Sequence, residues 1–140
     1  MTDLSPLDAS ALLANIRAHF IEGGNDLRMH LLEAGHEEPD RPCLLLLHGF
    51  PELAYSWPKV MPALAEAGYH VVAPDLPGYG RTAAGPVAYE ADLAPFRMHN
   101  LLLDLLCLLA ALGRERVVAV IGHDFGSWVA GFCARPEHVP

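Results

Sequence analysis

The sequence is poor in lysine, in clustered positive charge and in cysteine. Lys59 is the only lysine, and 9 basic against 17 acidic side chains leave a formal net charge of −8 over 140 residues. Because nucleic acids are bound by patches of Lys and Arg, we expect no nucleic-acid partner. The 3 cysteines, Cys43, Cys107 and Cys133, lie far apart in apolar segments, which favours reduced, buried thiols over disulfides or a zinc site.

A helix that spans a bilayer needs about 20 consecutive apolar residues, and the sequence has no apolar run of that length. The most apolar stretch, 101–112, is interrupted by Asp104 and predicts a buried helix. The first ten residues lack the basic segment and apolar core of a signal peptide. We therefore expect a cytoplasmic protein without a membrane partner. A hydrophobic content of 52% predicts a folded chain rather than a disordered one.

What the chain does contain is an alternation of strand-like and helix-like segments. Leucine spacing over 6–20 predicts a helix, so we expect a helical N-terminal segment at 1–19 ahead of a core at 20–140. A turn at 23–26 predicts a β-hairpin. Buried strands are expected at 43–47, 69–73 and 117–121, and helices at 62–67, 96–112 and 127–134. This order predicts an α/β fold with a mostly parallel sheet and flanking helices.

Gly122, Asp124 and Gly126 lie between an expected strand and an expected helix, which is the arrangement of a nucleophile elbow. A nucleophile on so tight a turn needs neighbours without side chains, as the two glycines are. Aspartate is ionised at pH 7 and can attack carbon directly, with the Phe125 N–H beside it to stabilise an oxyanion. In one alternative Asp124 only caps the helix. In another the nucleophile is Ser127, although it lies inside the expected helix.

His48, Gly49, Phe50 and Pro51 follow the first expected strand. Gly49 allows a close backbone approach, and the Phe50 N–H is a candidate for the second oxyanion donor. Pro51 fixes the turn and permits a cis peptide bond. The plainer alternative is an ordinary Gly-Pro turn. Trp57 follows shortly after, either near a pocket or as a core tryptophan.

Together these segments resemble the N-terminal half of the epoxide hydrolases of the α/β-hydrolase fold, the branch with an aspartate nucleophile. The resemblance covers about residues 20–138 and implies a core that stops after the helix following the elbow. The cap domain and the C-terminal core would be absent. It rests on the segments 48–52, 56–57, 62–65, 67–69, 75–80 and 122–126.

The resemblance implies that Asp124 opens a small apolar epoxide to an alkyl ester, which water then releases as a diol. Phe50 and Phe125 would donate backbone N–H groups to the oxyanion. His48 would shape its loop, with Gly49 and Pro51, rather than act as the base. No metal or organic cofactor is implied, and the histidines also lack ligand spacing.

Two other functions stay open. A haloalkane or haloacid dehalogenase of the same branch is the first, although Phe50 and Phe125 have no side-chain donor for a halide. The second is a short non-catalytic protein that pairs with a partner. Both dehalogenase types usually carry a polar, indole or arginine side chain where this chain has phenylalanine.

The rest of a catalytic triad is not evident in this sequence. After Asp124, only Glu137 and His138 could supply the acid and the histidine, and both follow the last expected helix. The cap tyrosines of the family also have no match. We therefore expect this chain alone to be inactive, and its open sheet edge to favour self-association. The remaining histidines, His19, His30, His36, His70, His99 and His123, are expected on the surface or in loops.

Overall fold

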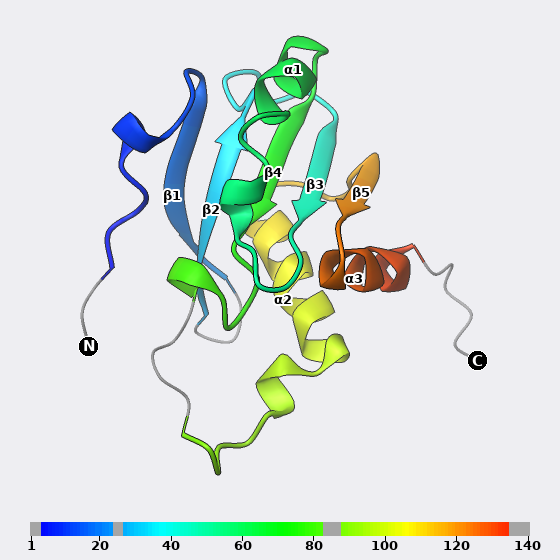
Figure 1. Cartoon of the computed structure of the whole chain (residues 1–140). Helices are drawn as coiled ribbons and strands as arrows, with labels where there is room; N and C mark the ends of the chain where they lie inside the picture. The colour runs from blue at the N-terminus through cyan, green and yellow to red at the C-terminus, as the bar shows by residue number, and fades with distance from the viewer. Residues whose placement is uncertain (1–3, 24–26, 83–87, 135–140) are drawn as a thin grey trace.

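The computed structural model describes residues 4–23, 27–82 and 88–134, which form a mixed five-stranded sheet in the order β1-β2-β4-β3-β5 (Figure 1). β1 and β2 pair antiparallel as predicted for the hairpin, whose expected turn residues 24–26 lie outside the described residues, and β2 is antiparallel to β4. β3 runs parallel to both β4 and β5. The strands are β1 (Ile16–Glu22), β2 (Arg28–Ala34), β3 (Cys43–Leu47), β4 (His70–Pro74) and β5 (Ala119–Gly122). The predicted α/β fold is confirmed, and its parallel part carries the candidate site.

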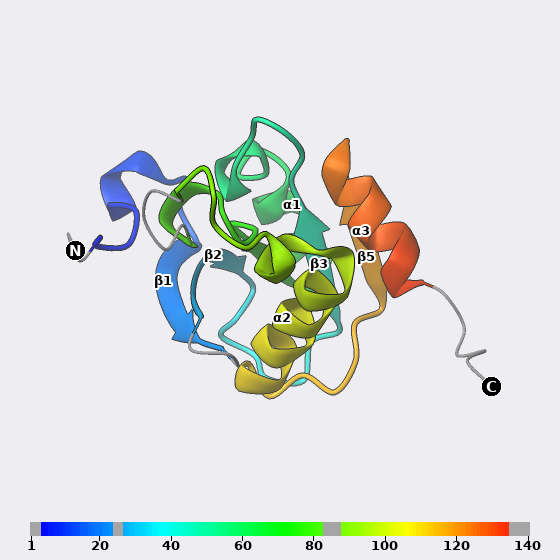
Figure 2. The same ribbon diagram turned by 90° about the horizontal axis from the view of Figure 1, so that it is seen from below.

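Helices cover both faces of this sheet (Figure 2). α1 (Met61–Glu66) packs on one face through Met61 and Ala65. α2 (Met98–Ala111) and α3 (Phe125–Cys133) pack on the other, and α3 lies beside β5. Four short 3-10 turns complete the described elements: Ala9–Ala11, Ala54–Ser56, Gly80–Thr82 and Ala94–Phe96. The helices predicted at 62–67, 96–112 and 127–134 are thus confirmed to within a few residues.

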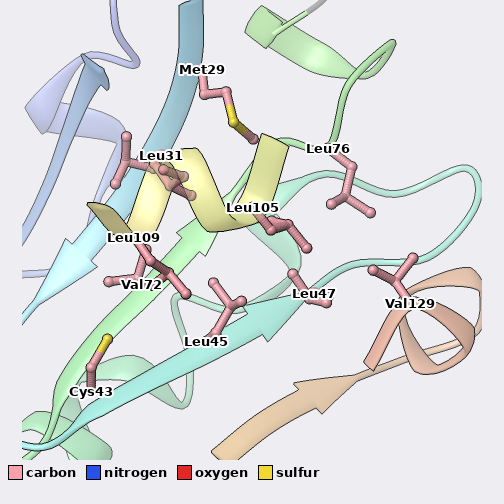
Figure 3. Packing of buried hydrophobic residues seen from close by; sticks show 11 residues of the cluster. Met29, Leu31, Cys43, Leu45, Leu47, Val72, Leu76, Leu105, Leu109 and Val129 are labelled. Atoms are coloured by element: carbon pink, nitrogen blue, oxygen red, sulfur yellow. The ribbon is translucent and has the colours of Figure 1, made fainter. Parts of the chain in front are cut away.

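The larger apolar core lies between the sheet and α2 (Figure 3). β3 contributes Leu45 and Leu47 to it, while Leu46 faces the α1 side, so the strand is buried on both faces. Its continuous run of apolar residues is typical of a central parallel strand. Each leucine replaced by alanine here should cost about 2–5 kcal/mol of stability.

The predicted helix over 6–20 is wrong. Residues 9–11 form one 3-10 turn, capped by the Asp8 carboxylate, and Asn15 has a positive φ of 68°. β1 then begins at Ile16 and pairs with β2 along its whole length, so the expected boundary at 19/20 falls inside a strand. Cross-strand pairing to a distant partner outweighs the local leucine spacing.

Two expectations about polar and sulfur side chains also need correction. Burial raises the pKa of Cys43 to about 11, as expected for an inert thiol, but Cys107 is only half-buried and Cys133 is exposed. His30 and His70 are buried rather than on the surface. Each is held by a buried carboxylate, since the His30 ring lies 2.9 Å from Asp75 and the His70 ring 2.7 Å from Glu33.

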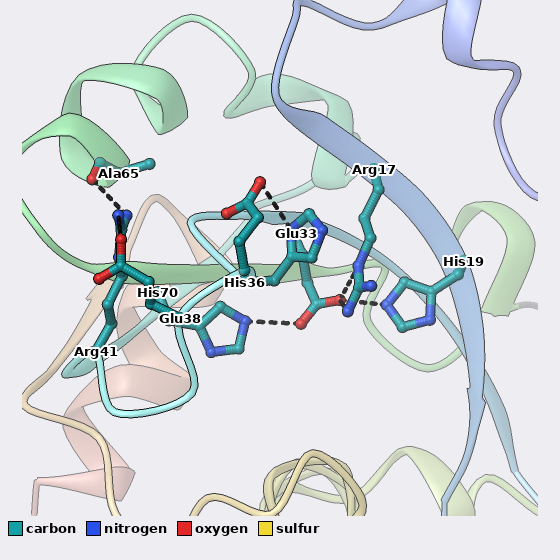
Figure 4. A network of polar contacts seen from close by, with 9 residues as sticks. Arg17, His19, Glu33, His36, Glu38, Arg41, Ala65 and His70 are labelled. Carbon is teal, nitrogen blue, oxygen red and sulfur yellow. Dashed lines mark hydrogen bonds and ion pairs between the residues drawn. The ribbon is translucent and has the colours of Figure 1, made fainter.

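Glu33 of β2 is the centre of a polar network that joins the hairpin to β4 (Figure 4). Arg17 donates to it at 2.9 Å, and the rings of His19 and His70 approach it from either side. Burial by itself raises the pKa of Glu33, but these hydrogen bonds outweigh burial and hold the pKa well below its usual value.

In the part of the chain that the structure describes, every helix is too short or too polar to span a lipid bilayer.

Candidate active site

Asp124 lies on the turn between β5 and α3 with φ 50° and ψ −120°, a conformation that L-residues rarely adopt. The backbone of this turn packs closely on itself and on the end of β3. A Cβ on Gly126 would lie 2.5 Å from the His48 carbonyl oxygen, and one on Gly122 would lie 2.5 Å from the Ser127 nitrogen. Gly122 therefore lets the turn close on the first residues of α3, and Gly126 lets the turn approach the end of β3.

The carboxylate of Asp124 is exposed and accepts a hydrogen bond from the Phe50 N–H at 2.9 Å. This N–H, and to a smaller degree the N–H of Phe125, hold the pKa of Asp124 below its usual value. The side chain makes no capping bond to α3. Ser127 lies in the first turn of α3, where its hydroxyl donates to the Asp124 carbonyl at 2.5 Å. The side-chain geometry therefore favours neither the helix cap nor Ser127.

The loop after β3 is shaped to reach Asp124. A Cβ on Gly49 would lie 2.5 Å from the Asp124 Cβ and 2.8 Å from the His123 carbonyl oxygen, so only glycine fits. The Phe50–Pro51 peptide bond is cis. The loop is therefore in direct contact with the turn that carries Asp124, as the sequence indicates.

His48 is fully buried beneath this loop and does not face Asp124. Its Nε2 accepts the Leu76 N–H at 2.9 Å, and its Nδ1 donates to the Gly49 carbonyl at 2.9 Å. Because an imidazolium has no acceptor, this pair of bonds requires the neutral ring with its proton on Nδ1. The arrangement suits a ring that shapes the loop.

An apolar hollow of about 380 Å³ opens beside the two loops. Phe50 and Phe125, whose N–H groups act on Asp124, line it together with Phe96 and Leu101. Pro77, Gly78 and Tyr79 complete the lining. Trp57 is not part of it, because this side chain packs with Met61 and Ala65 against the sheet face that α1 covers.

The family model described as alpha/beta hydrolase fold matches residues 42–139. The chain belongs to this α/β-hydrolase family. Epoxide hydrolase A from Mycobacterium tuberculosis is 51% identical over 105 residues, which are 75% of this chain and 30% of that protein.

Solved structures of two named epoxide hydrolases resemble this α/β-hydrolase chain as well. The enzyme from an endophytic Streptomyces has a TM-score of 0.74 and 38% identity, covering 87% of this chain and 34% of its own. Epoxide hydrolase A from Mycobacterium thermoresistibile has a TM-score of 0.68 and 46% identity, covering 81% and 33%. The chain therefore spans about a third of the length of its relatives.

Asp75 begins the segment 75–80 on which the family resemblance rests, but sequence reasoning gave it no role in the site. It is buried, and it accepts the Ala54 N–H at 2.9 Å, the Arg81 N–H at 3.0 Å and the His30 ring at 2.9 Å. Burial raises the pKa of Asp75, and these hydrogen bonds outweigh burial and lower it. Its position just after a buried strand was the available signal.

Glu52 and His123 were also missed as a pair, since 71 residues separate them. The His123 ring lies 3.2 Å from the Glu52 carboxylate at the exposed rim of the site. No histidine ring of residues 4–23, 27–82 and 88–134 hydrogen-bonds to the Asp124 side chain. Glu137 and His138 lie outside the described residues. Within those same ranges no three His, Cys, Asp or Glu side chains form a metal-binding group.

Proposed function

We propose that this chain is the N-terminal part of an epoxide hydrolase whose nucleophile is Asp124. The observation that carries the proposal is the hydrogen bond from the Phe50 N–H to the Asp124 carboxylate. This carboxylate is exposed and ionised, and it lies on a turn between two glycines. An oxygen of Asp124 attacks a ring carbon, the C–O bond of the epoxide breaks, and the released oxygen takes a proton from water, which leaves hydroxide. Water then attacks the ester carbonyl, which releases a diol and restores the carboxylate.

The Phe50 and Phe125 N–H groups take the role of oxyanion donors in the second step. One ester oxygen occupies the place where the Asp124 carboxylate oxygen lies 2.9 Å from the Phe50 nitrogen. Donors aimed at a developing negative charge usually contribute about 10²–10³ in rate each. Both donors are backbone groups, so they are rigid and independent of pH.

The apolar hollow supports a substrate with an apolar substituent on the epoxide. Phe96 and Leu101 offer it contacts without hydrogen-bonding groups. Phe50 and Phe125 also favour an epoxide over a haloalkane or haloacid, because neither side chain can donate to a leaving halide. None of the described residues that line the hollow is basic, which does not suit a nucleic acid.

The chain alone is expected to form the ester slowly and to stop there. Hydrolysis of the ester needs a base, and ring opening without a general acid is slower by about 10²-fold or more. In the alternative, non-catalytic reading, the chain pairs with a partner or with a second copy through the edge at β5. Exposed apolar side chains at that edge, Val118 and Trp128 among them, favour this self-association. A cytoplasmic location stays part of the proposal.

Two reagents of similar size separate these functions. The purified chain is mixed with styrene oxide or with 1-bromo-2-phenylethane, and the loss of epoxide or the release of bromide is followed. In a Cys133→Ser background, which removes the exposed thiol as a competing nucleophile, an epoxide hydrolase site consumes about one epoxide per chain, and Asp124→Asn abolishes the reaction. Faster release of bromide than loss of epoxide would identify a dehalogenase site instead. No Asp124-dependent reaction with either reagent would leave the non-catalytic reading.

A further inference from the structure

The peptide unit between Gly49 and Phe50 is held from the side opposite to Asp124. Its carbonyl oxygen, that of Gly49, accepts both the His48 Nδ1–H and the Glu52 N–H at 2.9 Å. In a trans peptide the C=O and the N–H point in opposite directions within one rigid plane. Fixing the Gly49 carbonyl therefore fixes the direction of the Phe50 N–H, which donates to Asp124 at 2.9 Å.

The His48 ring that holds this carbonyl is itself anchored to the end of β4. Its Nε2 accepts the Leu76 N–H at 2.9 Å, and the Tyr79 ring packs edge-on against it with 5.1 Å between ring centroids. A buried ring with a bond on each nitrogen has little freedom to rotate. The orientation of the Phe50 N–H is thus transmitted from the backbone after β4.

The other end of the same loop, at Ala54, is hydrogen-bonded to Asp75, the residue next to Leu76. The Ala54 N–H donates to the Asp75 carboxylate, and Asp75 is fixed in turn by the Arg81 N–H and the His30 ring. Residues 75 and 76 consequently hold the loop 48–54 at both ends. Neither Asp75 nor His48 touches Asp124, so any effect they have on it must pass through the loop.

We propose that His48 and Asp75 are positioning residues that aim the Phe50 N–H at Asp124, His48 through the Gly49 carbonyl and Asp75 through Ala54. The inference rests on the proposed function for its catalytic meaning. Its physical content, the orientation of one N–H, is independent of any reaction. A merely structural role would lower stability without moving that N–H.

Two substitutions at position 48 separate the bonds of the ring. In His48→Asn the amide nitrogen takes the place of Nδ1 and keeps the donor to Gly49. In His48→Gln the amide oxygen takes the place of Nε2 and keeps the acceptor for Leu76, but the donor to Gly49 is lost. Both variants stay polar and similar in size, and each loses one of the two bonds: His48→Gln the donor to Gly49, and His48→Asn the acceptor for Leu76.

The readouts are NMR measurements on the whole chain without substrate. The Asp124 carboxyl carbon is followed against pH, and exchange of the Phe50 amide hydrogen is timed. His48→Gln should shift the Asp124 titration to higher pH and speed Phe50 exchange about tenfold, the usual worth of one hydrogen bond. His48→Asn keeps the donor to Gly49 and loses only the acceptor for Leu76, so it should move both readouts in the same direction but less than His48→Gln. His123 is the charged side chain that acts on Asp124, and its ring lies 3.2 Å from the Glu52 carboxylate; the variants leave both residues in place.

Asp75→Asn is a second variant, which weakens the hydrogen bond from the Ala54 N–H at the other end of the loop. Both readouts should move in the same direction as in His48→Gln. Glu33→Gln is the control for general destabilisation, because its network lies away from the loop 48–54. The proposal is overturned if His48→Gln or Asp75→Asn folds with wild-type readouts. It is also overturned if Glu33→Gln moves the readouts equally. Since no epoxide is present, a failure here is distinct from a failure of Asp124 to react.

Discussion

The carboxylate of Asp124 is exposed to solvent, yet backbone N–H groups keep its pKa below the usual aspartate range. The group therefore stays ionised at neutral pH and remains so somewhat below the pH at which a free aspartate is protonated. A carboxylate nucleophile needs no base to activate it. In the proposed function, this ionised carboxylate is the group that would form the carbon–oxygen bond to the enzyme.

Gly49→Ala should disturb this carboxylate directly. The new methyl group would lie 2.5 Å from the Asp124 Cβ, so the loop or the turn must shift. We expect a loss of about 1–3 kcal/mol in the free energy of unfolding, the usual cost of overpacking, measured by urea denaturation. The Asp124 carboxyl should also titrate at higher pH as the Phe50 N–H moves away. Wild-type stability together with an unchanged titration would contradict the close contact.

At this scale the sequence predicted local features well and distant partners poorly. Asp124 and Phe50 could be placed together because each follows a buried strand of a parallel sheet, and such strands end at one edge. The buried positions of His30 and His70 could not be predicted. Their partners, Asp75 and Glu33, are 45 and 37 residues away, and no local pattern records such a pairing.

At the scale of elements, α3 contains two glycines with opposite surroundings. A Cβ on Gly126 would lie 2.5 Å from the His48 carbonyl oxygen, whereas one on Gly131 would have nothing within 4 Å. Gly126→Ala should therefore cost about 1–3 kcal/mol of stability. Gly131→Ala should add up to about 1 kcal/mol, since alanine favours a helix. Urea denaturation of both variants tests the pair, and equal effects would argue against close packing of α3 on β3.

The strands β1, β2 and β4 share the carboxylate of Glu33, which makes their stability dependent on pH. Because the pKa of Glu33 is lowered on folding, its contribution is fully present above the ordinary glutamate pKa of about 4.3. That contribution is lost as the pH falls from there toward the lower pKa of the folded state. Stability should thus decline steadily in this acid range.

Glu33→Gln tests this dependence. The variant should lose about 2–4 kcal/mol at pH 7, less than the 3–5 kcal/mol of a fully buried pair because Arg17 reaches solvent. Its stability should also fall less steeply than that of the wild type below about pH 4.3. Urea denaturation at several pH values measures both effects. Parallel pH profiles for the two proteins would show that Glu33 is not the titrating group.

The element predictions succeeded where burial on two faces dictates composition and failed where pairing decides. The five apolar residues of β3 could be little else than a central strand. Residues 6–20 have leucines at helical spacing, yet Asn15 has a positive φ and β1 pairs with β2. The hairpin itself was predicted from the sequence, but the extension of β1 back to Ile16 was not, because the leucine spacing favoured a helix there.

At the scale of the whole molecule, β5 pairs with β3 and with no other strand of the described residues. Exposed apolar side chains lie on and beside β5 and α3: Trp128 is 70% exposed and Val118 is 57% exposed. An unpaired edge next to exposed apolar side chains favours association. This edge is where we expect copies of the isolated chain to meet.

Replacing Val118 and Trp128 together by lysine should weaken that association at least about tenfold, since charge on an edge opposes pairing. Sedimentation velocity over a range of concentrations provides the measurement. Tyr89→Lys is the matched control, because Tyr89 is 99% exposed and is not part of β5 or α3. If the wild type sediments as a monomer at every concentration, self-association through this edge is refuted.

The α/β architecture of the whole was predictable because alternating elements and two glycine-rich turns agree with one fold. The neutral state of His48 and the hydrogen bonds that Asp75 accepts were not predictable, because both depend on backbone groups that the fold brings together. The catalytic roles of Asp124, Phe50 and Phe125 are still predictions.

The central claim is that the Asp124 carboxylate forms an ester with an epoxide carbon. The direct measurement is peptide mass analysis of the chain after reaction with styrene oxide, in a Cys133→Ser background because the exposed thiol of Cys133 is a competing nucleophile. We predict a mass increase of one whole epoxide molecule, located on Asp124 and absent in Asp124→Asn. An unmodified Asp124, or an increase that persists in Asp124→Asn, would contradict the account.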